Sequence, residues 1–169
     1  MLEMNEIKQI EKWTNKKLGE IIFDSDKDEW SENTSTFDTK LMNKSNVLIL
    51  IEENKNGIKF GQFIYKKIDK LNDYVQDKRS FLYTFKDNDP KIFHNKKTRP
   101  YSISLFDKQH SYLAYIGNDI HLMKKGQQSF CNDGESTFFD YKGEINQLIG
   151  GTSNYTFFTP NRILVIQMK

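Results

Sequence analysis

The segment VLILIEENKNGIKFGQFIY, residues 47–65, decides the fold class of this chain. Val47–Ile51 is an apolar run rich in β-branched residues within a predicted strand at Val47–Glu52, and Ile58–Tyr65 resumes the strand pattern with bulky apolar side chains. Asn54–Gly57 lies between the two runs and ends in Asn-Gly, the pair that tight hairpin turns favour. The segment therefore predicts an antiparallel β-hairpin in which Gly61 is buried against a backbone or an aromatic ring.

Short strands are also predicted on both sides of this hairpin. Ile163–Met168 has five apolar residues out of six, so we expect a central strand that is buried on both faces. Several short strands with few helices predict an α+β, mainly β fold, in which two antiparallel sheets form a sandwich flanked by a few helices. The predicted strands are Leu18–Phe23, Ser80–Phe85, Lys91–Phe93, Tyr101–Phe106, Tyr112–Ile116, Asp119–Met123, Phe138–Tyr141 and Ile163–Met168.

Two helices are predicted outside the sheets. In residues 2–17, apolar side chains recur three or four positions apart, with charged side chains between them. We expect an N-terminal helical leader at 1–17, followed by a single domain over 18–169. A second helix fits Thr34–Met42, with Thr34 as its N-cap residue.

The length and charge of the chain exclude several classes of protein. The sequence has 169 residues, enough for one domain with a hydrophobic core. Its 25 basic and 23 acidic residues leave a net charge of +2, which excludes a strong global field for steering nucleic acid. Cys131 is the only cysteine, so neither an intrachain disulfide nor a multi-cysteine zinc module forms. No apolar run spans a membrane and no secretory signal is recognised, so we expect a cytoplasmic protein.

The sequence predicts no metal site and no cofactor. Asp24, Asp26 and Asp28 occupy the first, third and fifth positions of a calcium-loop pattern, but the pattern then fails. Glu29 stands where glycine is required, and Ser35 stands where a bidentate glutamate is required. The three histidines match no metal motif, and no phosphate-cradling glycine loop is present. A solvated acidic turn is therefore expected.

A basic stretch, Lys91–Arg99, is a candidate for binding an anionic partner. Lys96 and Lys97 belong to it, aromatic residues lie beside them, and no acid interrupts the stretch. Basic residues interleaved with aromatic ones bind nucleic acid or anionic lipid. The same composition is common in solvated loops, so both interpretations stay open. The polar segment Lys66–Arg79, further upstream, is predicted to be a loop.

Two loops are candidates for a protein-binding surface: Lys124–Glu135 and the polar turn that ends at Trp30. A partner surface needs exposed polar groups and an aromatic anchor, and Trp30 or Phe130 would supply the anchor. Asp133 and Glu135 would supply hydrogen-bond acceptors. For Trp30, packing under the second helix is the alternative.

A catalytic role has few candidate residues. Cys131 lies in a polar context, but a nucleophilic thiol needs a nearby base, and nothing in the sequence requires His121 to approach it. Asp119, Asp133 and Glu135 are the acidic residues that could take part in a peroxide-handling or hydrolytic reaction. An incidental cysteine is the alternative interpretation.

Several segments, taken in order, resemble the TLDc domain family over Trp13–Met168. The order and spacing of the segments carry the resemblance, because no single motif is specific. Phe60-Gly61-Gln62-Phe63 is similar to a Phe-Gly-Gly-Tyr-like motif in the family's hairpin, and the lysine- and asparagine-rich composition is similar to that of protozoan members. The other segments are Leu18–Ser25, Asp28–Ser31, Leu48–Ile51, Ser80–Phe85, Ile116–Leu122, Leu148–Gly151 and Asn161–Ile166.

The resemblance assigns a structural role to five residues: Gly61, Gly117, Asp119, Gly150 and Gly151. It also implies a sandwich of two antiparallel sheets, in agreement with the strand pattern. Family members are linked to protection from oxidative damage, and several bind the peripheral sector of the vacuolar proton pump. No accepted enzymatic mechanism and no cofactor come with the resemblance.

The chain departs from the family pattern at two positions. Gln62 replaces the second glycine of the hairpin motif. Leu164 stands where many members carry a glutamate, so the role suggested for that acid does not carry over.

The resemblance implies a non-enzymatic TLDc-type protein-interaction domain in oxidative-stress protection or regulation of the vacuolar proton pump. We expect a protein partner, such as the peripheral subunits of that pump. Two alternatives come from the residues alone. One is a nucleic-acid-binding regulatory protein that uses Lys91–Arg99, and the other is a peroxide-handling or hydrolytic enzyme.

Overall fold

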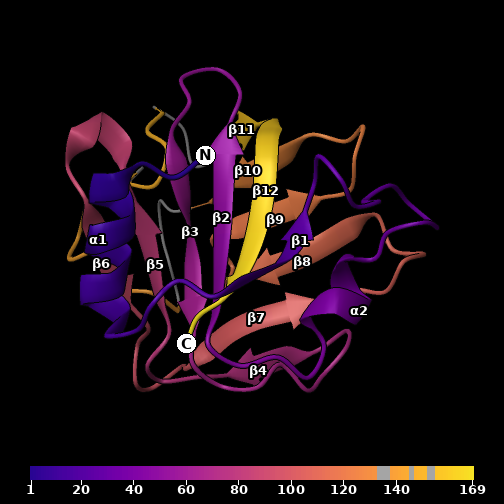
Figure 1. Ribbon diagram of the computed structural model, residues 1–169, viewed down its shortest axis with the longest axis horizontal. Coiled ribbons are helices and arrows are strands. Elements are labelled where there is room, and N and C mark those ends of the chain that lie inside the picture. Colours follow the sequence, from indigo (N-terminus) through magenta and orange to yellow (C-terminus); the bar gives the residue numbers. More distant parts are fainter. Residues whose placement is uncertain (133–137, 145–146, 152–154) are drawn as a thin grey trace.

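The strands of this chain form two layers. The computed structural model describes residues 1–132, 138–144, 147–151 and 155–169. Within these residues, two antiparallel six-stranded sheets pack face to face, and the strands of one sheet run across those of the other (Figure 1). The prediction of a mainly β sandwich with a few helices is therefore confirmed.

The first sheet contains the predicted hairpin together with the first and last strands. Its order is β1 (Glu20–Asp24), β12 (Pro160–Gln167), β2 (Val47–Glu53), β3 (Lys59–Ile64), β5 (Phe81–Thr84) and β6 (Lys91–His94). The second sheet has the order β11 (Thr156–Phe158), β10 (Ser129–Cys131), β9 (Ile120–Met123), β8 (Tyr112–Ile116), β7 (Tyr101–Leu105) and β4 (Tyr74–Gln76). Outside the sheets lie helix α1 (Met4–Thr14), the short helix α2 (Phe37–Leu41) and a 3₁₀ turn at Lys86–Asn88.

The hairpin lies in the middle of the first sheet, as the sequence predicts. β2 and β3 pair antiparallel, with Leu50 opposite Gly61. Both faces of these strands are buried. Phe60 belongs to the core between the sheets, whereas Leu48 and Leu50 pack on the outer face in one cluster with Ile10 of α1. Burial on both faces explains why this segment is a nearly continuous apolar run.

The last strand, β12, is inserted between β1 and β2, so it is internal in the first sheet. Ile163 and Val165 belong to the core between the sheets, and Leu164 and Ile166 belong to the outer cluster. The prediction of an internal strand that is buried on both faces is confirmed. The apolar environment of Leu164 fits the absence of a glutamate there.

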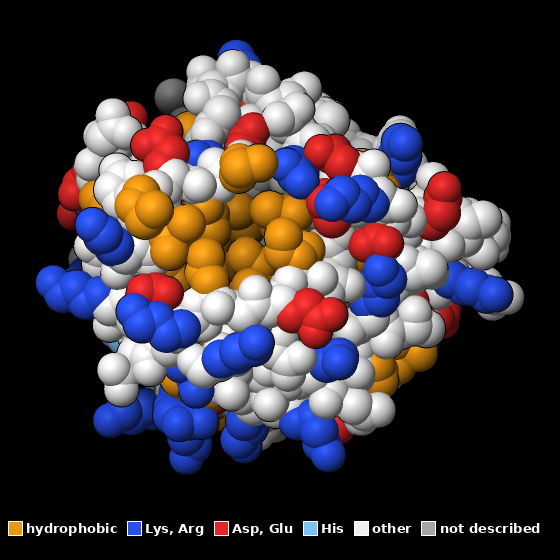
Figure 2. All heavy atoms as spheres, viewed as in Figure 1, with side chains coloured by type: hydrophobic (Ala, Val, Ile, Leu, Met, Phe, Trp, Pro, Cys, Tyr) orange, Lys and Arg blue, Asp and Glu red, His pale blue; other side chains and the backbone are white. Residues whose placement is uncertain are grey.

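Helix α1 covers part of the outer face of the first sheet. Its Ile10 is buried, and Trp13 stacks on Phe85 with ring centroids 5.7 Å apart. A reciprocal capping box begins the helix, and Asn15 in a left-handed conformation ends it. Figure 2 shows an apolar hollow beside this helix, over β2, β3 and β12. The helix predicted over 2–17 is thus present with shorter bounds.

Two segments predicted as loops contain strands. β4 lies within Lys66–Arg79, and β10 lies within Lys124–Glu135. Each strand has three residues, and the inward positions of β10 are the small side chains of Ser129 and Cys131. Such a short pattern carries no recognisable period, so only the pairing with neighbouring strands reveals these elements. β11 escapes prediction for the same reason.

Two further local predictions are wrong. Helix α2 begins at Phe37 with Thr36 at the N-cap position, whereas the Thr34 hydroxyl donates to Glu29 at 3.4 Å instead. Phe138–Tyr141 does not form a strand; it contributes a single bridge at Phe139.

Gly61 has no room for a side chain. A Cβ atom at this position would clash with the carbonyl oxygen of Ile49 and would lie 3.2 Å from the Tyr83 hydroxyl. That hydroxyl donates a 2.8 Å hydrogen bond to the same Ile49 carbonyl. The Tyr83 side chain therefore passes over β3 at Gly61, next to the position where a side chain of residue 61 would lie. The predicted close approach at Gly61 is confirmed.

Gln62, which replaces a glycine of the hairpin motif, links the two sheets. Its side chain is fully buried on the inner face of β3. Its amide nitrogen donates to the backbone carbonyl of Ser102 at 3.2 Å and to the hydroxyl of Ser102 at 2.9 Å. Because Ser102 lies on β7, this departure from the motif creates a polar contact across the core.

An ion pair connects the first strand to the last. Asp24 accepts two hydrogen bonds from Arg162, one from Nε at 3.1 Å and one from Nη2 at 2.9 Å. Asp28 accepts a hydrogen bond from Lys40 at 2.6 Å. The expected solvated acidic turn is therefore partly buried, because Asp24 is only 3% exposed. Among the described residues, no group of three potential ligand side chains could hold a metal ion.

Replacement of Gly61 by valine is expected to destabilise the protein by about 1–3 kcal/mol, because the added methyl groups would displace the Tyr83 hydroxyl and press on β2. Urea denaturation would measure the free energy of unfolding. Tyr83→Phe keeps the ring and removes only the hydroxyl, so that variant should lose about 1 kcal/mol. A Gly61→Val protein as stable as the wild type would contradict the close approach.

The Asp24–Arg162 pair predicts a pH-dependent stability. Hydrogen bonds from Arg162 lower the pKa of the Asp24 carboxyl below its ordinary value of about 3.9. The pair therefore stabilises the fold above that ordinary value, and its contribution is lost as the pH falls through the lower, folded pKa. Asp24→Asn should cost about 1–3 kcal/mol at neutral pH and progressively less below about pH 4.

The matched control for this measurement is Asp26→Asn. The Asp26 carboxylate also contacts Arg162, at 3.2 Å, but its side chain is 58% exposed. A change in unfolding free energy within about 0.5 kcal/mol is expected for the control. A loss in Asp24→Asn that does not change with pH would argue against the ion pair.

Candidate functional site

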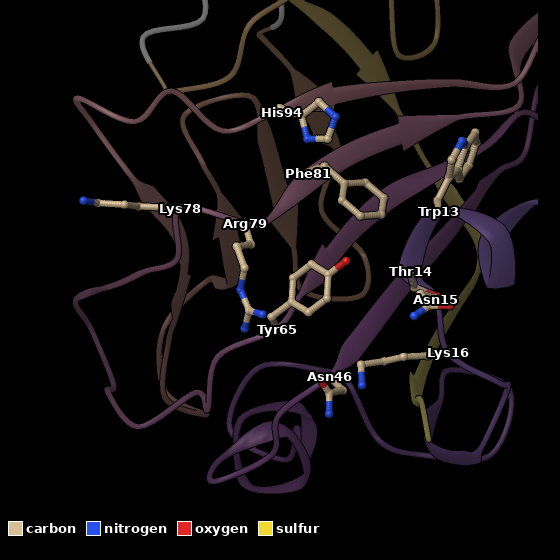
Figure 3. A pocket seen from close by; sticks show the side chains of 10 residues that line it. All are labelled: Trp13, Thr14, Asn15, Lys16, Asn46, Tyr65, Lys78, Arg79, Phe81 and His94. Atoms are coloured by element: carbon tan, nitrogen blue, oxygen red, sulfur yellow. The ribbon is translucent and has the colours of Figure 1, made fainter.

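A groove lies where the end of α1 meets the outer face of the first sheet (Figure 3). It has a volume of about 730 Å³ and is open to solvent. Trp13 and Lys16 line it from the end of the helix, and Tyr65, Arg79 and Phe81 line it from β3 and β5 and their flanking residues. This α1 groove is completed by Thr14, Asn15, Asn46, Lys78 and His94.

Aromatic rings form the apolar part of the α1 groove. Phe81 is nearly buried, at 2% exposed, and the Trp13 ring meets it edge-on at a centroid distance of 6.4 Å. His94 contacts the same ring at 6.1 Å. Tyr65 packs edge-on against Phe63 at 4.6 Å. The groove therefore offers apolar surface from both the helix and the sheet.

Arg79 lies over the ring of Tyr65. Its guanidinium carbon is 4.4 Å from the ring centroid, which is within the range of a cation–π contact. In Figure 3 the Tyr65 hydroxyl points toward the interior of the α1 groove. Burial raises the pKa of this hydroxyl, so it remains protonated at neutral pH and can donate a hydrogen bond.

Asp77 holds the backbone of this region in place. Its carboxylate accepts hydrogen bonds from the backbone N–H groups of Tyr65 at 2.7 Å, Lys66 at 3.0 Å and Arg79 at 3.0 Å. The residue is only 1% exposed, so its charge is turned toward the protein interior. Asp77 thereby fixes the end of β3 next to the segment that enters β5, and this brings Tyr65 and Arg79 together.

The basic stretch Lys91–Arg99 does not form the groove. Of its residues, only His94 lines the cavity. Lys91 forms an ion pair at 3.3 Å, Lys97 is exposed after β6, and Lys96 is half-buried. The structure thus spreads these side chains along β6 and the following loop.

The predicted aromatic anchors lie in different environments. Trp30 is half-buried and packs against the core between the sheets. This environment favours the alternative interpretation, in which Trp30 is a packing residue. Phe130 lies on β10 and stacks on His121 with ring centroids 4.3 Å apart. Asp133 and Glu135 lie outside the described residues.

The candidate catalytic residues within the described chain are buried. Cys131 is fully buried in β10, so the expectation of a thiol in a polar loop is wrong. Asp119 is fully buried and accepts a 2.7 Å hydrogen bond from the Tyr141 hydroxyl. At Gly117, φ is +58° and a Cβ atom would lie 2.6 Å from the Phe139 ring, which explains the glycine. Gly117 and Asp119 therefore belong to a packed turn, and Cys131 belongs to a buried strand.

The family model for the TLDc domain matches residues 2–138, well over half of the chain. The chain belongs to the TLDc domain family. The matched part of this TLDc domain includes α1, the hairpin and every residue that lines the α1 groove. The motif residues Gly150 and Gly151 and the closing strand β12 lie beyond it. No curated protein matches the chain. Among the described residues, no helix is long and apolar enough to cross a membrane.

Sequence reasoning misses the α1 groove of this TLDc domain. Trp13 lies within the helix predicted over residues 2–17, while Tyr65 ends a predicted strand and Arg79 ends a predicted loop. The only local signal is the basic and aromatic composition of residues 78–81. Trp13, Tyr65 and Arg79 come together because β3 pairs with β5 and α1 packs on the sheet. No local sequence pattern specifies these long-range contacts.

Asp77→Asn is expected to destabilise the domain by about 1–3 kcal/mol, because an asparagine side chain offers one acceptor oxygen to three backbone N–H groups. Chemical denaturation would measure the change. Asp69→Asn is the control, since Asp69 is exposed in the same connection and should change stability by less than about 0.5 kcal/mol. Equal stability of both variants would exclude Asp77 as the residue that organises the groove.

Proposed function

We propose that this TLDc domain is a non-enzymatic protein-interaction module that binds the peripheral sector of the vacuolar proton pump and thereby contributes to protection from oxidative damage. The family assignment supports this proposal, because such partners and roles are associated with TLDc proteins. The surface described next supports it physically.

The observation that carries the proposal is an exposed aromatic strip, formed by Phe130, Tyr155 and Phe157. Tyr155 is 54% exposed and Phe157 is 58% exposed, which is unusual for large aromatic side chains. Phe130 lies between them and His121, with centroid distances of 5.8 Å to both exposed rings. The neighbours Ser129 and Cys131 are buried, so Phe130 and its paired residue Phe157 face outward from the second sheet.

Aromatic contacts continue from this strip across the second sheet. His121 contacts Tyr115 at 4.6 Å, Tyr115 contacts Tyr112 at 4.7 Å, and Tyr115 also contacts Phe106 at 4.7 Å. Aromatic residues are enriched at the energetic centres of protein interfaces, since they bury a large area at a small cost in side-chain entropy. A broad aromatic face of this kind suits a protein partner better than a small ligand.

The two alternatives have less support. For a nucleic-acid-binding regulator, the cations of Lys91–Arg99 would have to act together, but they are spread along a strand and a loop, and the net charge is only +2. For a peroxide-handling or hydrolytic enzyme, the candidates within the described residues are Cys131 and Asp119, and both are fully buried. Asp133 and Glu135 lie outside the described residues.

Phe157→Ser is expected to weaken binding of the purified peripheral pump sector by roughly tenfold or more, because it removes the most exposed ring of the aromatic strip. Biolayer interferometry with the immobilised domain would measure the dissociation constant. Ile21→Ser is the matched control: Ile21 is 51% exposed, but it lies on β1 of the other sheet. Its affinity should stay within about twofold of the wild type.

Three outcomes would count against the proposal. The wild-type domain could fail to bind the pump sector at all. Both variants could lose affinity equally, which would indicate non-specific apolar association. Phe157→Ser could also bind as tightly as the wild type while Ile21→Ser does not, which would move the interface to the first sheet.

A further inference from the structure

We propose that the α1 groove is a second binding site, which takes an acidic peptide segment that carries an aromatic or large aliphatic side chain beside its carboxylates. The groove lies on the outer face of the first sheet, whereas the aromatic strip lies on the second sheet. This inference therefore goes beyond the proposed function and does not depend on the pump as a partner.

The charge of the α1 groove selects an anionic ligand. Its lining includes three basic side chains, those of Lys16, Lys78 and Arg79, together with His94. None of its described lining residues is acidic. Within the described chain, Lys16, Lys78 and Arg79 form no ion pair. Figure 2 shows lysine and arginine side chains gathered along the lower edge of the molecule, where α1 ends.

Two negative features lie close to these basic side chains. The Asp77 carboxylate is buried, does not line the groove and already accepts hydrogen bonds from three backbone N–H groups, which partly compensate its charge. The carbonyl ends of α1 contribute a partial negative charge of about half a unit, which acts only over the last turn. The basic side chains of Lys16 and Arg79 carry full charges at the groove itself.

Arg79 is oriented for a carboxylate. Because its guanidinium lies over the Tyr65 ring, the edge of the group and its N–H donors remain available to a ligand. A guanidinium fixed in this way loses little entropy when it forms two parallel hydrogen bonds to a carboxylate. In Figure 3 the Tyr65 hydroxyl points from the opposite end of the ring toward the helix side of the groove, where it provides a further donor.

The remaining lining residues favour a peptide over a small anion. Trp13 and Phe81 supply an apolar contact for a side chain. Asn15 and Asn46 carry amide groups, which match the donor and acceptor of a peptide bond. The cavity is open to solvent, so a chain can pass through it, whereas a small anion would remain largely hydrated. Figure 3 shows Lys78 extending away from these residues, where it can meet a continuing acidic chain.

The fluorescence of Trp13 provides a direct test. The chain has two tryptophans, so Trp30→Phe leaves Trp13 as the only tryptophan reporter. The probe is a synthetic Glu-Glu-Phe-Glu-Glu-Leu-Glu peptide, titrated into the full-length domain. We expect a saturable change in Trp13 emission, an affinity that falls as salt is raised, and weaker binding when Phe and Leu of the peptide are replaced by Ser.

Variants of the domain separate the groove from general charge. Arg79→Glu should weaken peptide binding by roughly tenfold or more, and Arg79→Met, which keeps an apolar stem, should weaken it less. Lys55→Glu is the matched control. It makes the same change in net charge on an exposed lysine in the hairpin turn, at the opposite end of β2 and β3. Its affinity should stay within about twofold of the wild type. Thermal denaturation of each variant would establish that it is folded.

The outcomes are decisive in either direction. Equal losses in Arg79→Glu and Lys55→Glu would overturn the proposal, because they would show non-specific charge attraction. Absence of a Trp13 response at peptide saturation would overturn it as well. Binding of inorganic phosphate or ATP without binding of the acidic peptide would assign the groove to a small anion instead. These titrations do not contain the pump sector. A negative result for the peptide would therefore overturn the groove proposal without bearing on the proposed function, which the Phe157→Ser measurement tests separately.

Discussion

The outer face of the first sheet depends on one close approach, that of the Tyr83 hydroxyl to the Ile49 carbonyl above Gly61. A Cβ atom at Gly61 would overlap the Ile49 carbonyl oxygen and crowd the Tyr83 hydroxyl, 3.2 Å away. Because Tyr83 lies across β3, its ring gives Trp13 of α1 a surface to pack on, with ring centroids 6.2 Å apart. This contact helps to hold the last turn of α1 against the sheet, and the α1 groove lies where the helix ends beside Phe81.

The sandwich itself is closed by contacts between distant parts of the chain. β12 enters between β1 and β2, and Arg162 binds the carboxylate of Asp24 at the edge of that pairing. Between the sheets, Gln62 reaches Ser102, so the amide nitrogen of the residue that replaces a motif glycine has hydrogen-bond acceptors in the core. A buried amide without such partners would be costly, which explains why the two polar residues lie opposite each other.

The two candidate surfaces of this TLDc domain differ in their chemistry. The aromatic strip has little charge and would contribute binding energy mainly through buried area. The α1 groove has basic side chains around an apolar floor, so charge would guide its ligand. Because the surfaces belong to different sheets, one partner could occupy both, or two partners could be held at once. Binding at the groove would be far more sensitive to salt than binding at the strip.

The sequence by itself determines the hairpin, the helical spacing of α1 and the doubly buried character of β12, because each is encoded by apolar spacing and turn residues within one short segment. The ordered motifs also determine the family. Tertiary structure alone decides that β10 is a strand, that Cys131 is buried, and that Trp13, Tyr65 and Arg79 meet in one groove. Local spacing specifies which face of an element is apolar, whereas a groove depends on which elements pack together, and that is fixed only by long-range contacts of the whole chain.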